Sequence, residues 1–152
     1  MFTNFVECLG DAIVNIKSNN TNKKKVLMVQ GLHEEGQKLF LARDDIEPIT
    51  IMSANEDEIM EAAKDVHGIT VRTANISRKI IENSKNLLIV SRHGVGYDSI
   101  DVDALNDSNI PLAIAAHSNM ISVAEHAMFM LLALSKNVFY YDSFARKADW
   151  TS

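Results

Sequence analysis

Short apolar runs alternate with helical patterns along most of this sequence, and that alternation constrains the fold more than any other feature. Each run has the length of a buried strand and is rich in β-branched or other apolar residues. Parallel strands are joined by crossover connections that cover both faces of the sheet, so the sequences of these strands are apolar throughout. The pattern therefore predicts an α/β fold with a doubly wound, five-stranded parallel sheet, its strands at 26–29, 48–51, 68–71, 87–90 and 111–114.

The stretches between these runs carry helix signals. The stretch 32–43 follows a glycine and predicts a helix. Asn55 stands before three acidic residues, and asparagine caps a helix N-terminus while the helix dipole favours acidic residues in the first turn. By the same reasoning Asn75 is expected to cap a helix over 77–83. The residues expected on one stripe of the first helix are Leu32, Gly36, Leu39 and Phe40.

The two ends of the sequence differ from this pattern. Residues 1–22 begin with apolar residues at helical spacing and end in a polar cluster, so we expect an amphipathic helix and linker there, and a domain over 23–152. The stretch Ser122 to Trp150 contains no glycine or proline and predicts one long helix. Its front half, Val123 to Leu134, is apolar nearly all round, and such a helix has to be buried on more than one side.

Composition and charge exclude several classes of protein. The chain carries 15 Lys and Arg against 20 Asp and Glu, with no basic face, which argues against nucleic-acid binding. The longest apolar run covers residues 127–134, far short of the roughly 20 residues that cross a bilayer. With no secretory signal and a single cysteine, Cys8, the expected location is the cytoplasm. The histidines lack the spacing of a metal-binding pair, so no metal site is expected.

The common nucleotide-binding loops are absent from the sequence. The segment Val29 to His33, after the first predicted strand, has one glycine, and neither GxGxxG nor GxxxxGK[ST] occurs anywhere. The third predicted strand ends in Val71-Arg72-Thr73, where a phosphate-receiver domain would need an aspartate. Neither a nucleotide-binding nor a receiver function is therefore predicted.

The segment Ser91 to Asp101 carries the most information about function. It follows the fourth predicted strand, and ligands of open α/β sheets bind at the carboxyl ends of strands. Gly94 and Gly96 let the backbone turn its N–H groups toward a ligand and form a small concavity for an anion such as a carboxylate. A plain glycine-containing turn is the alternative for so short a motif.

A wider set of segments extends this signal from about Lys25 to Trp150. In order, the segments are Arg72-Thr73, Arg92 to Asp101, Asn109-Ile110-Pro111, Ser118-Asn119 and Ser122 to His126. Together they resemble the substrate-binding domain of the D-isomer-specific 2-hydroxyacid dehydrogenases, most of all the phosphoglycerate dehydrogenase branch. The resemblance implies a flavodoxin-like domain with a long C-terminal helix. It also implies an oxidoreductase that passes a hydride between a small D-2-hydroxy acid and NAD.

The resemblance assigns roles to five residues. The backbone amides of Gly94, Val95 and Gly96 would hold the substrate carboxylate, and Val95 would also approach the nicotinamide. Arg72 would lie near the anionic end of the substrate, and Asn119 would face the cleft between domains. The residues before Asn119 differ from the Asn-Thr-Pro-Gly run common in the family, so the choice among 2-hydroxy and 2-oxo acids stays open.

The family's dinucleotide-binding domain, with its catalytic Arg, Glu and His, would begin just after Trp150, and this sequence stops at Ser152. We therefore expect a substrate-binding domain truncated before its Rossmann partner, inactive alone and without catalytic residues of its own. The alternative is a non-catalytic binding or dimerisation module derived from the family. In that case Val123 to Leu134 would form a homodimer surface, because a large exposed apolar patch usually marks a partner.

Overall fold

The computed structural model describes residues 23–147, and the expected helix and linker over residues 1–22 lie outside them. The chain divides between Ser118 and Asn119 into two compact units, and each is described by itself. The first unit alternates strands and helices as the sequence predicts. Its elements are β1 (Lys24–Val29), α2 (Glu34–Leu41), β2 (Ile46–Ile51), α3 (Glu56–Ala62), β3 (Gly68–Val71), α4 (Arg78–Asn83), β4 (Ile89–Arg92), α5 (Val102–Asp107) and β5 (Leu112–Ile114).

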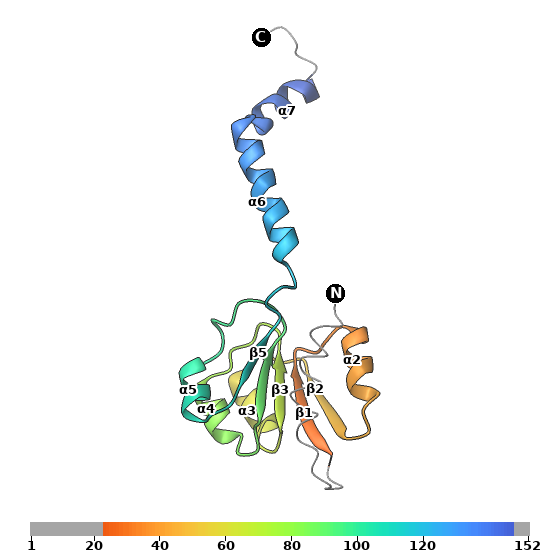
Figure 1. Ribbon diagram of the computed structural model, residues 1–152, viewed down its shortest axis with the longest axis vertical. Coiled ribbons are helices and arrows are strands. Elements are labelled where there is room, and N and C mark those ends of the chain that lie inside the picture. The colour runs from red at the N-terminus through yellow and green to blue at the C-terminus, as the bar shows by residue number, and fades with distance from the viewer. Residues whose placement is uncertain (1–22, 148–152) are drawn as a thin grey trace. The chain divides into compact units, whose positions relative to one another are not determined.

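The five strands form one sheet in the order β2-β1-β3-β4-β5, and every neighbouring pair is parallel (Figure 1). This order is that of flavodoxin-like doubly wound folds. The predicted α/β fold with a five-stranded parallel sheet is therefore confirmed. Because all five strands run the same way, the segments that follow β3 and β4 emerge at the same edge of the sheet.

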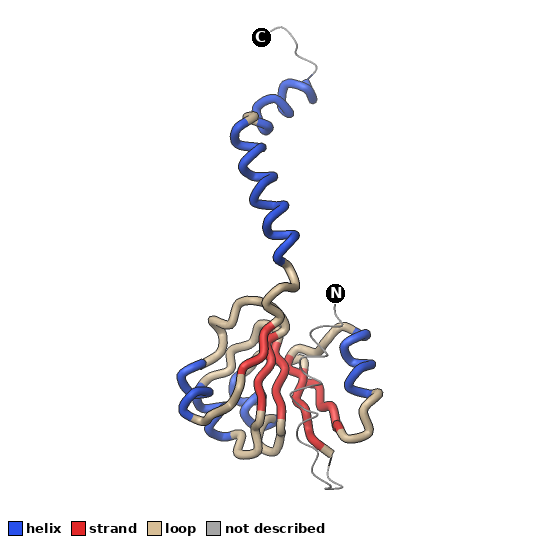
Figure 2. The backbone as a smooth tube through the Cα atoms, in the orientation of Figure 1, coloured by secondary structure: helices blue, strands red, loops and turns tan. Residues whose placement is uncertain are grey.

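The main core lies on one face of this sheet, between the strands and the helices α3, α4 and α5 (Figure 2). The β1→β2 connection moves along the sheet in the opposite direction to the other three crossovers. Because crossovers are right-handed, this difference places α2 on the opposite face. No residue of α2 belongs to the main core cluster. That cluster includes Leu27 and Val29 of β1, Ile69 and Val71 of β3, Val90 of β4, Ile59 of α3, Ile80 of α4 and Leu105 of α5.

Several predicted boundaries differ from the structure. β4 begins at Ile89 rather than at 87, because the amide of Leu87 donates to the carbonyl of Ser84 and continues the turn that ends α4. The first helix covers only Glu34–Leu41, and Leu39, which the sequence placed on one stripe with Leu32, Gly36 and Phe40, is 43% exposed.

The two predicted helix caps have different outcomes. Asn55 caps α3 as expected, since its side-chain oxygen accepts from the amides of Asp57 and Glu58 at 2.9 and 3.2 Å. Asn75 does not cap α4, whose N-cap residue is Ser77. The reason is that Ile76 still forms a bridge with Ile100, so the chain stays extended one residue beyond Asn75.

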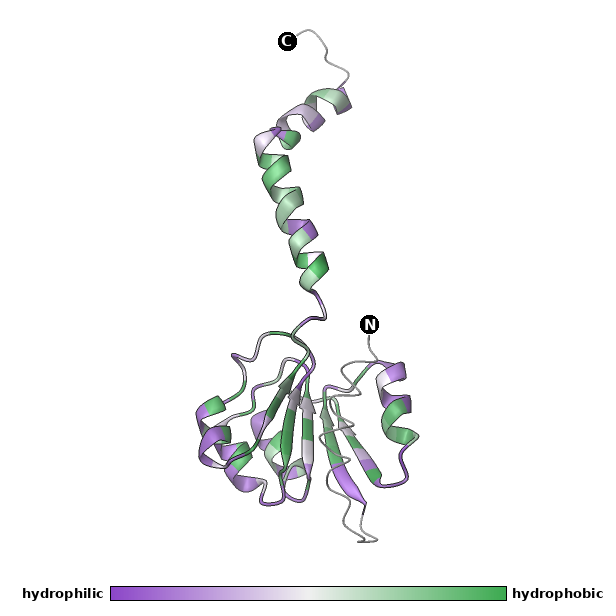
Figure 3. Cartoon of the chain, viewed as in Figure 1, coloured by the Kyte–Doolittle hydropathy of each residue, from purple (hydrophilic) through white to green (hydrophobic). Residues whose placement is uncertain are grey.

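The second unit contains two helices, α6 (Met120–Ser135) and α7 (Val138–Lys147), where the sequence predicted one helix from Ser122 to Trp150. The break falls at Asn137, which has a φ of 50°, a conformation that asparagine tolerates and that ends helices. α6 is apolar around most of its circumference (Figure 3), and in the structure all its residues except Ala133 are exposed. Among the described residues, no helix is long and apolar enough to cross a membrane.

Candidate functional site

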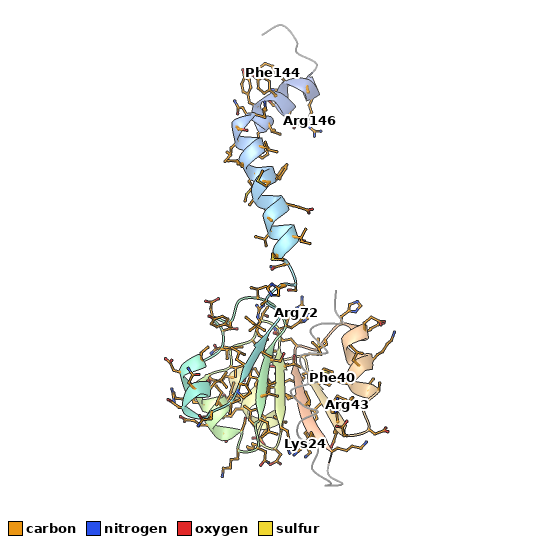
Figure 4. All side chains as sticks on the ribbon, viewed as in Figure 1. Lys24, Phe40, Arg43, Arg72, Phe144 and Arg146 are labelled. Carbon is orange, nitrogen blue, oxygen red and sulfur yellow. The ribbon has the colours of Figure 1, made fainter. Side chains whose placement is uncertain are left out.

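The site lies at the edge of the sheet where β3 and β4 end. Arg72 follows the last residue of β3, and the loop from His93 to Tyr97 follows β4. The amide of His93 donates to the carbonyl of Val71 at 2.8 Å, which ties the start of the loop to the residue before Arg72. Arg72 and Lys24 mark opposite ends of the sheet (Figure 4).

The glycine loop, residues 93–97, has free backbone amides. The amide of Gly94 donates to the carbonyl of Arg92 at 2.9 Å, so it is already used within the loop. The amides of Val95 and Gly96 have no hydrogen-bond acceptor among residues 23–147. The loop is not helical, and it therefore presents two adjacent N–H groups that an anion can accept from.

Gly94 takes a backbone conformation that favours glycine, with a φ of 156°. A Cβ atom at this position would lie 1.5 Å from Nη1 of Arg92, so the guanidinium group of Arg92 rests against the loop backbone. The conformation of Gly96 is an ordinary one, and a Cβ there would meet only Oδ2 of Asp98, at 3.4 Å. The first glycine therefore shapes the loop more than the second.

Arg92 is a residue that the sequence reasoning did not single out. It is the last residue of β4, and its Nη1 contacts the carbonyl of His93 at 3.5 Å. Its Nε is buried and has no partner within the described range 23–147. Neither Arg72 nor Arg92 forms a salt bridge within residues 23–147. A second arginine directly before the glycine motif was the available signal, because arginine can hold two oxygens of one anion.

Both arginines affect the neighbouring His93. The pKa of His93 is lowered by burial and by the positive charges of Arg72 and Arg92. His93 is therefore neutral at pH 7, and its Nδ1 is buried without a partner in the described part of the chain. The two arginines thus stay unpaired with any carboxylate of residues 23–147, in a chain whose formal net charge is −5.

Gln30 supports the loop that carries Arg72. Its side-chain oxygen accepts from the amide of Thr73, the hydroxyl of Thr73 and the amide of Ala74, at 2.7, 3.0 and 2.9 Å. Gln30 itself has a φ of 66°, and Gly31 follows with a φ of 65°. In the sequence, this segment stands out only because it lacks a phosphate-binding motif, so its structural role was not predicted.

The remaining predicted site residue, Asn119, belongs to the second unit. It is the N-cap residue of α6, and its side chain accepts no hydrogen bond from an amide of that helix. The structure brings together Arg72, Gly94, Val95 and Gly96, while the role of Asn119 stays a prediction. Within residues 23–147 no group of three or more His, Cys, Asp or Glu side chains has the arrangement of a metal site.

The described residues do not form a dinucleotide site. The loop from β1 to α2 reads Gln30-Gly31-Leu32-His33, so it lacks the glycines that let a backbone approach a pyrophosphate. His33 also fills the N-terminus of α2, where its Nδ1 accepts from the amide of Glu35 at 3.4 Å. The loop from β1 to α2 therefore does not fit the pyrophosphate of NAD.

Comparison with known proteins identifies the family. A model for the catalytic domain of D-isomer specific 2-hydroxyacid dehydrogenases matches residues 26–148. The chain therefore belongs to the D-isomer-specific 2-hydroxyacid dehydrogenase family, as its motifs suggested.

Individual relatives agree with this assignment. The chain is 31% identical over 127 residues to the D-3-phosphoglycerate dehydrogenase of Methanocaldococcus jannaschii, an alignment that covers 83% of this chain and 24% of the relative. Among solved structures, it is similar to the PH0520 protein of Pyrococcus horikoshii, with a TM-score of 0.74 and 26% identity. The match covers 86% of this chain and 39% of that one. It is also similar to the NAD+-bound 3-phosphoglycerate dehydrogenase of Entamoeba histolytica, with a TM-score of 0.62 and 26% identity. That match covers 73% of this chain and 39% of the other. The chain thus spans about a quarter of the length of the phosphoglycerate dehydrogenase that it matches in sequence.

Proposed function

We propose that residues 23–152 act as the substrate-binding domain of an NAD-dependent D-2-hydroxyacid dehydrogenase. The observation that carries the proposal is the pair of amides at Val95 and Gly96, which have no acceptor in the described part of the chain, beside two arginines that form no salt bridge there. Backbone N–H groups and guanidinium groups are what a small carboxylate needs in order to bind.

The substrate carboxylate accepts from the amides of Val95 and Gly96, in the loop shaped by Gly94. Arg72 would then lie near the other, anionic end of the molecule, while the guanidinium of Arg92 rests against the loop backbone at Gly94. Arg92 lies against the loop backbone, Arg72 follows the neighbouring strand β3, and both lower the pKa of His93. Two cations beside one loop favour a substrate with a second anionic group. The substrate class that fits is a small 2-hydroxy or 2-oxo acid, and a phosphorylated one fits best.

The chemistry of hydride transfer lies outside these residues. Val95 is the residue for which we propose contact with the nicotinamide, while NAD itself would be held by a dinucleotide-binding domain that residues 23–147 do not provide. Asn119 would face the cleft between the two domains. We therefore expect the chain of 152 residues to bind substrate without turning it over.

Amide chemical-shift titration of the whole chain tests substrate binding. We expect D-glycerate to shift the signals of Val95 and Gly96, and 3-phospho-D-glycerate to bind more tightly because its phosphate adds contacts to arginine. A titration with inorganic phosphate alone shows which shifts come from the phosphate group, and so separates them from the shifts that the carboxylate causes. The absence of any shift at Val95 and Gly96 with both acids would contradict the proposal.

Arginine variants sharpen this test. Arg72→Gln should weaken 3-phospho-D-glycerate by about tenfold, the loss expected for one charge-assisted contact, and should change D-glycerate binding less. Arg78→Gln is the matched control. Arg78 lies in α4, away from the loop, and is paired with Asp107 of α5 at 2.8 Å. Equal losses in the two variants would point to a general charge effect instead of a site.

The exposed apolar surface of α6 favours a second candidate, a binding module that forms a homodimer through this helix. Leu131, Leu132 and Leu134 are each more than half exposed. Sedimentation equilibrium should then show dimers that Leu131→Glu dissociates and Lys136→Glu does not. A monomer at all concentrations would remove this candidate and leave substrate binding untouched.

A further inference from the structure

His93 is the side chain of the glycine loop whose charge can change near neutral pH. It stands between Arg92, the last residue of β4, and Gly94. Val71 pairs with Arg92, so Arg72 and His93 are the first residues beyond this pair on the two chains. The amide of His93 donates to the carbonyl of Val71 at 2.8 Å and continues the ladder. The residue is thus held at the start of the loop.

The amides proposed to bind the acid lie close to His93. Val95 and Gly96, whose amides have no acceptor among residues 23–147, are the second and third residues after it. Two residues of fully extended chain span about 7 Å, so the Cα atoms of His93 and Val95 are no further apart than that. This is less than the screening length of about 8 Å at physiological ionic strength, so the charge of a bound acid acts on the imidazole ring.

The ring of His93 differs from that of His67 in what a proton would cost. The Nδ1 of His67 accepts from the amide of Lys25 at 3.2 Å, so a proton on that nitrogen would break a hydrogen bond. The Nδ1 of His93 is buried, and no group in the described part of the chain donates to it. His93 can therefore gain a proton without losing a hydrogen bond, once a negative charge nearby stabilises the imidazolium form.

The charges that already act on His93 keep it neutral. Burial, and then the positive charges of Arg72 and Arg92, lower its pKa. A carboxylate bound in the loop would offset these two charges and favour the protonated ring.

Other ionisable groups around the loop do not compete for this role. Asp98, the next carboxylate along the chain, is exposed and forms no ion pair with a cation among residues 23–147. On the side of β5, the amide of Ala115 donates to the carbonyl of Gly94 at 3.0 Å. The segment from Ala115 to Ser118 carries one ionisable side chain, His117, which is exposed.

We propose that His93 takes up a proton when an acid binds to the glycine loop, and so adds a third positive charge to the occupied site. This inference rests on the proposed function and adds a dependence of substrate binding on pH. Because protonation and binding are linked, each strengthens the other by the same factor. The acid should therefore bind more tightly as the pH falls through the range in which His93 titrates, and its affinity should be constant well above that range.

The affinity for D-glycerate at different pH values tests this proposal. Its carboxyl group titrates near pH 3.5, so the ligand keeps one charge between about pH 8 and about pH 6. We expect the affinity, followed by the amide signals of Val95 and Gly96, to rise several-fold over that range. His93→Gln should abolish the rise, and His117→Gln, the matched control, should retain it. A constant affinity in the native chain, or a rise that persists in His93→Gln, would overturn the proposal.

The ring signals of His93 give a second measurement that needs no substitution. Saturating D-glycerate should move the titration of His93 to higher pH and leave that of His67, at the other end of the sheet, unchanged. Binding of D-glycerate with no change in the titration of His93, or with equal changes at both histidines, would overturn this inference alone. No binding at any pH would overturn the proposed function as well.

Discussion

The side-chain oxygen of Gln30 accepts hydrogen bonds from both the backbone amide and the hydroxyl of Thr73, at 2.7 and 3.0 Å. This contact joins the ends of β1 and β3 and fixes the residue that follows Arg72. Gln30→Met keeps the length of the side chain and removes the acceptor, and we expect it to lower the free energy of unfolding by about 2 kcal/mol. Gln30→Glu retains an acceptor and should lose less. Urea denaturation measures both, and equal stability of the methionine variant and the native chain would contradict this account.

The helix caps give a second prediction. Asn55→Ala should destabilise the protein by about 1 kcal/mol, because the amides of Asp57 and Glu58 lose their acceptor. Asn55→Ser should recover most of the loss. Asn75→Ala, at the cap position that the sequence predicted wrongly, should change the free energy of unfolding by less than about 0.5 kcal/mol. Thermal melting distinguishes these outcomes. A larger loss of stability in Asn75→Ala than in Asn55→Ala would contradict the finding that Asn55 caps a helix and Asn75 does not.

Two buried serines should respond differently to the loss of their hydroxyl groups. Ser84 donates to the carbonyl of Ile80 at 2.7 Å, so Ser84→Ala should cost about 1 kcal/mol in the free energy of unfolding. Ser91 is equally buried, but its hydroxyl has no partner among the described residues, so Ser91→Ala should be neutral or stabilising. Urea denaturation of the pair is the measurement, and a destabilised Ser91→Ala would show that its hydroxyl is in fact bonded.

The glycine loop gives a prediction about backbone conformation. Gly94→Ala should destabilise the chain by about 1–3 kcal/mol, because alanine resists this φ and its Cβ collides with Arg92. Gly96→Ala should cost little, since its φ is ordinary and its nearest neighbour is a surface carboxylate. Equal losses in melting temperature for Gly94→Ala and Gly96→Ala would contradict the φ and the Arg92 contact described for Gly94.

The titration of His93 reports on the charge around the site. Its pKa is lowered in the folded state, so the unfolded chain binds the proton first as the pH falls below about 6.5. The contribution of His93 to stability is therefore complete above that pH and is lost progressively below it. In NMR titrations, Arg72→Gln and Arg92→Gln should each raise the pKa of His93, and so should a bound anion.

His67 is the control for this titration. Its pKa is also lowered, by burial and by Lys24 and Lys25 at the other end of the sheet. Replacing Arg72 or Arg92 should leave the pKa of His67 unchanged. A parallel shift of both histidines would indicate a global change in the protein rather than a local loss of charge.

Much of the fold could be predicted because parallel strands leave a clear pattern in the sequence. The strand Gly68–Val71 was predicted with its observed bounds, and the other strands to within two residues. Helix ends were harder, since they depend on contacts between distant segments. Asn75 looked like a cap in isolation, but the pairing of Ile76 with Ile100 kept the chain extended there.

The site was predictable in its main-chain part and less so in its side chains. The spacing of Gly94 and Gly96 indicated an anion-binding loop after a strand, and the free amides lie at Val95 and Gly96. The part played by Arg92 depends on its side chain folding back onto Gly94, and no local pattern encodes that. The support from Gln30 joins residues more than 40 positions apart and was invisible for the same reason.

The arginines at the ends of β3 and β4 stand in a chain whose formal net charge is −5. Beyond about 8 Å, the screening length at physiological ionic strength, neither the local nor the overall charge guides a small solute strongly. Only within that distance do the two guanidinium groups determine the electrostatic force on the solute. An acid and an uncharged analogue of the same size should therefore arrive at similar rates, and the difference in their affinity should appear in how long each remains bound.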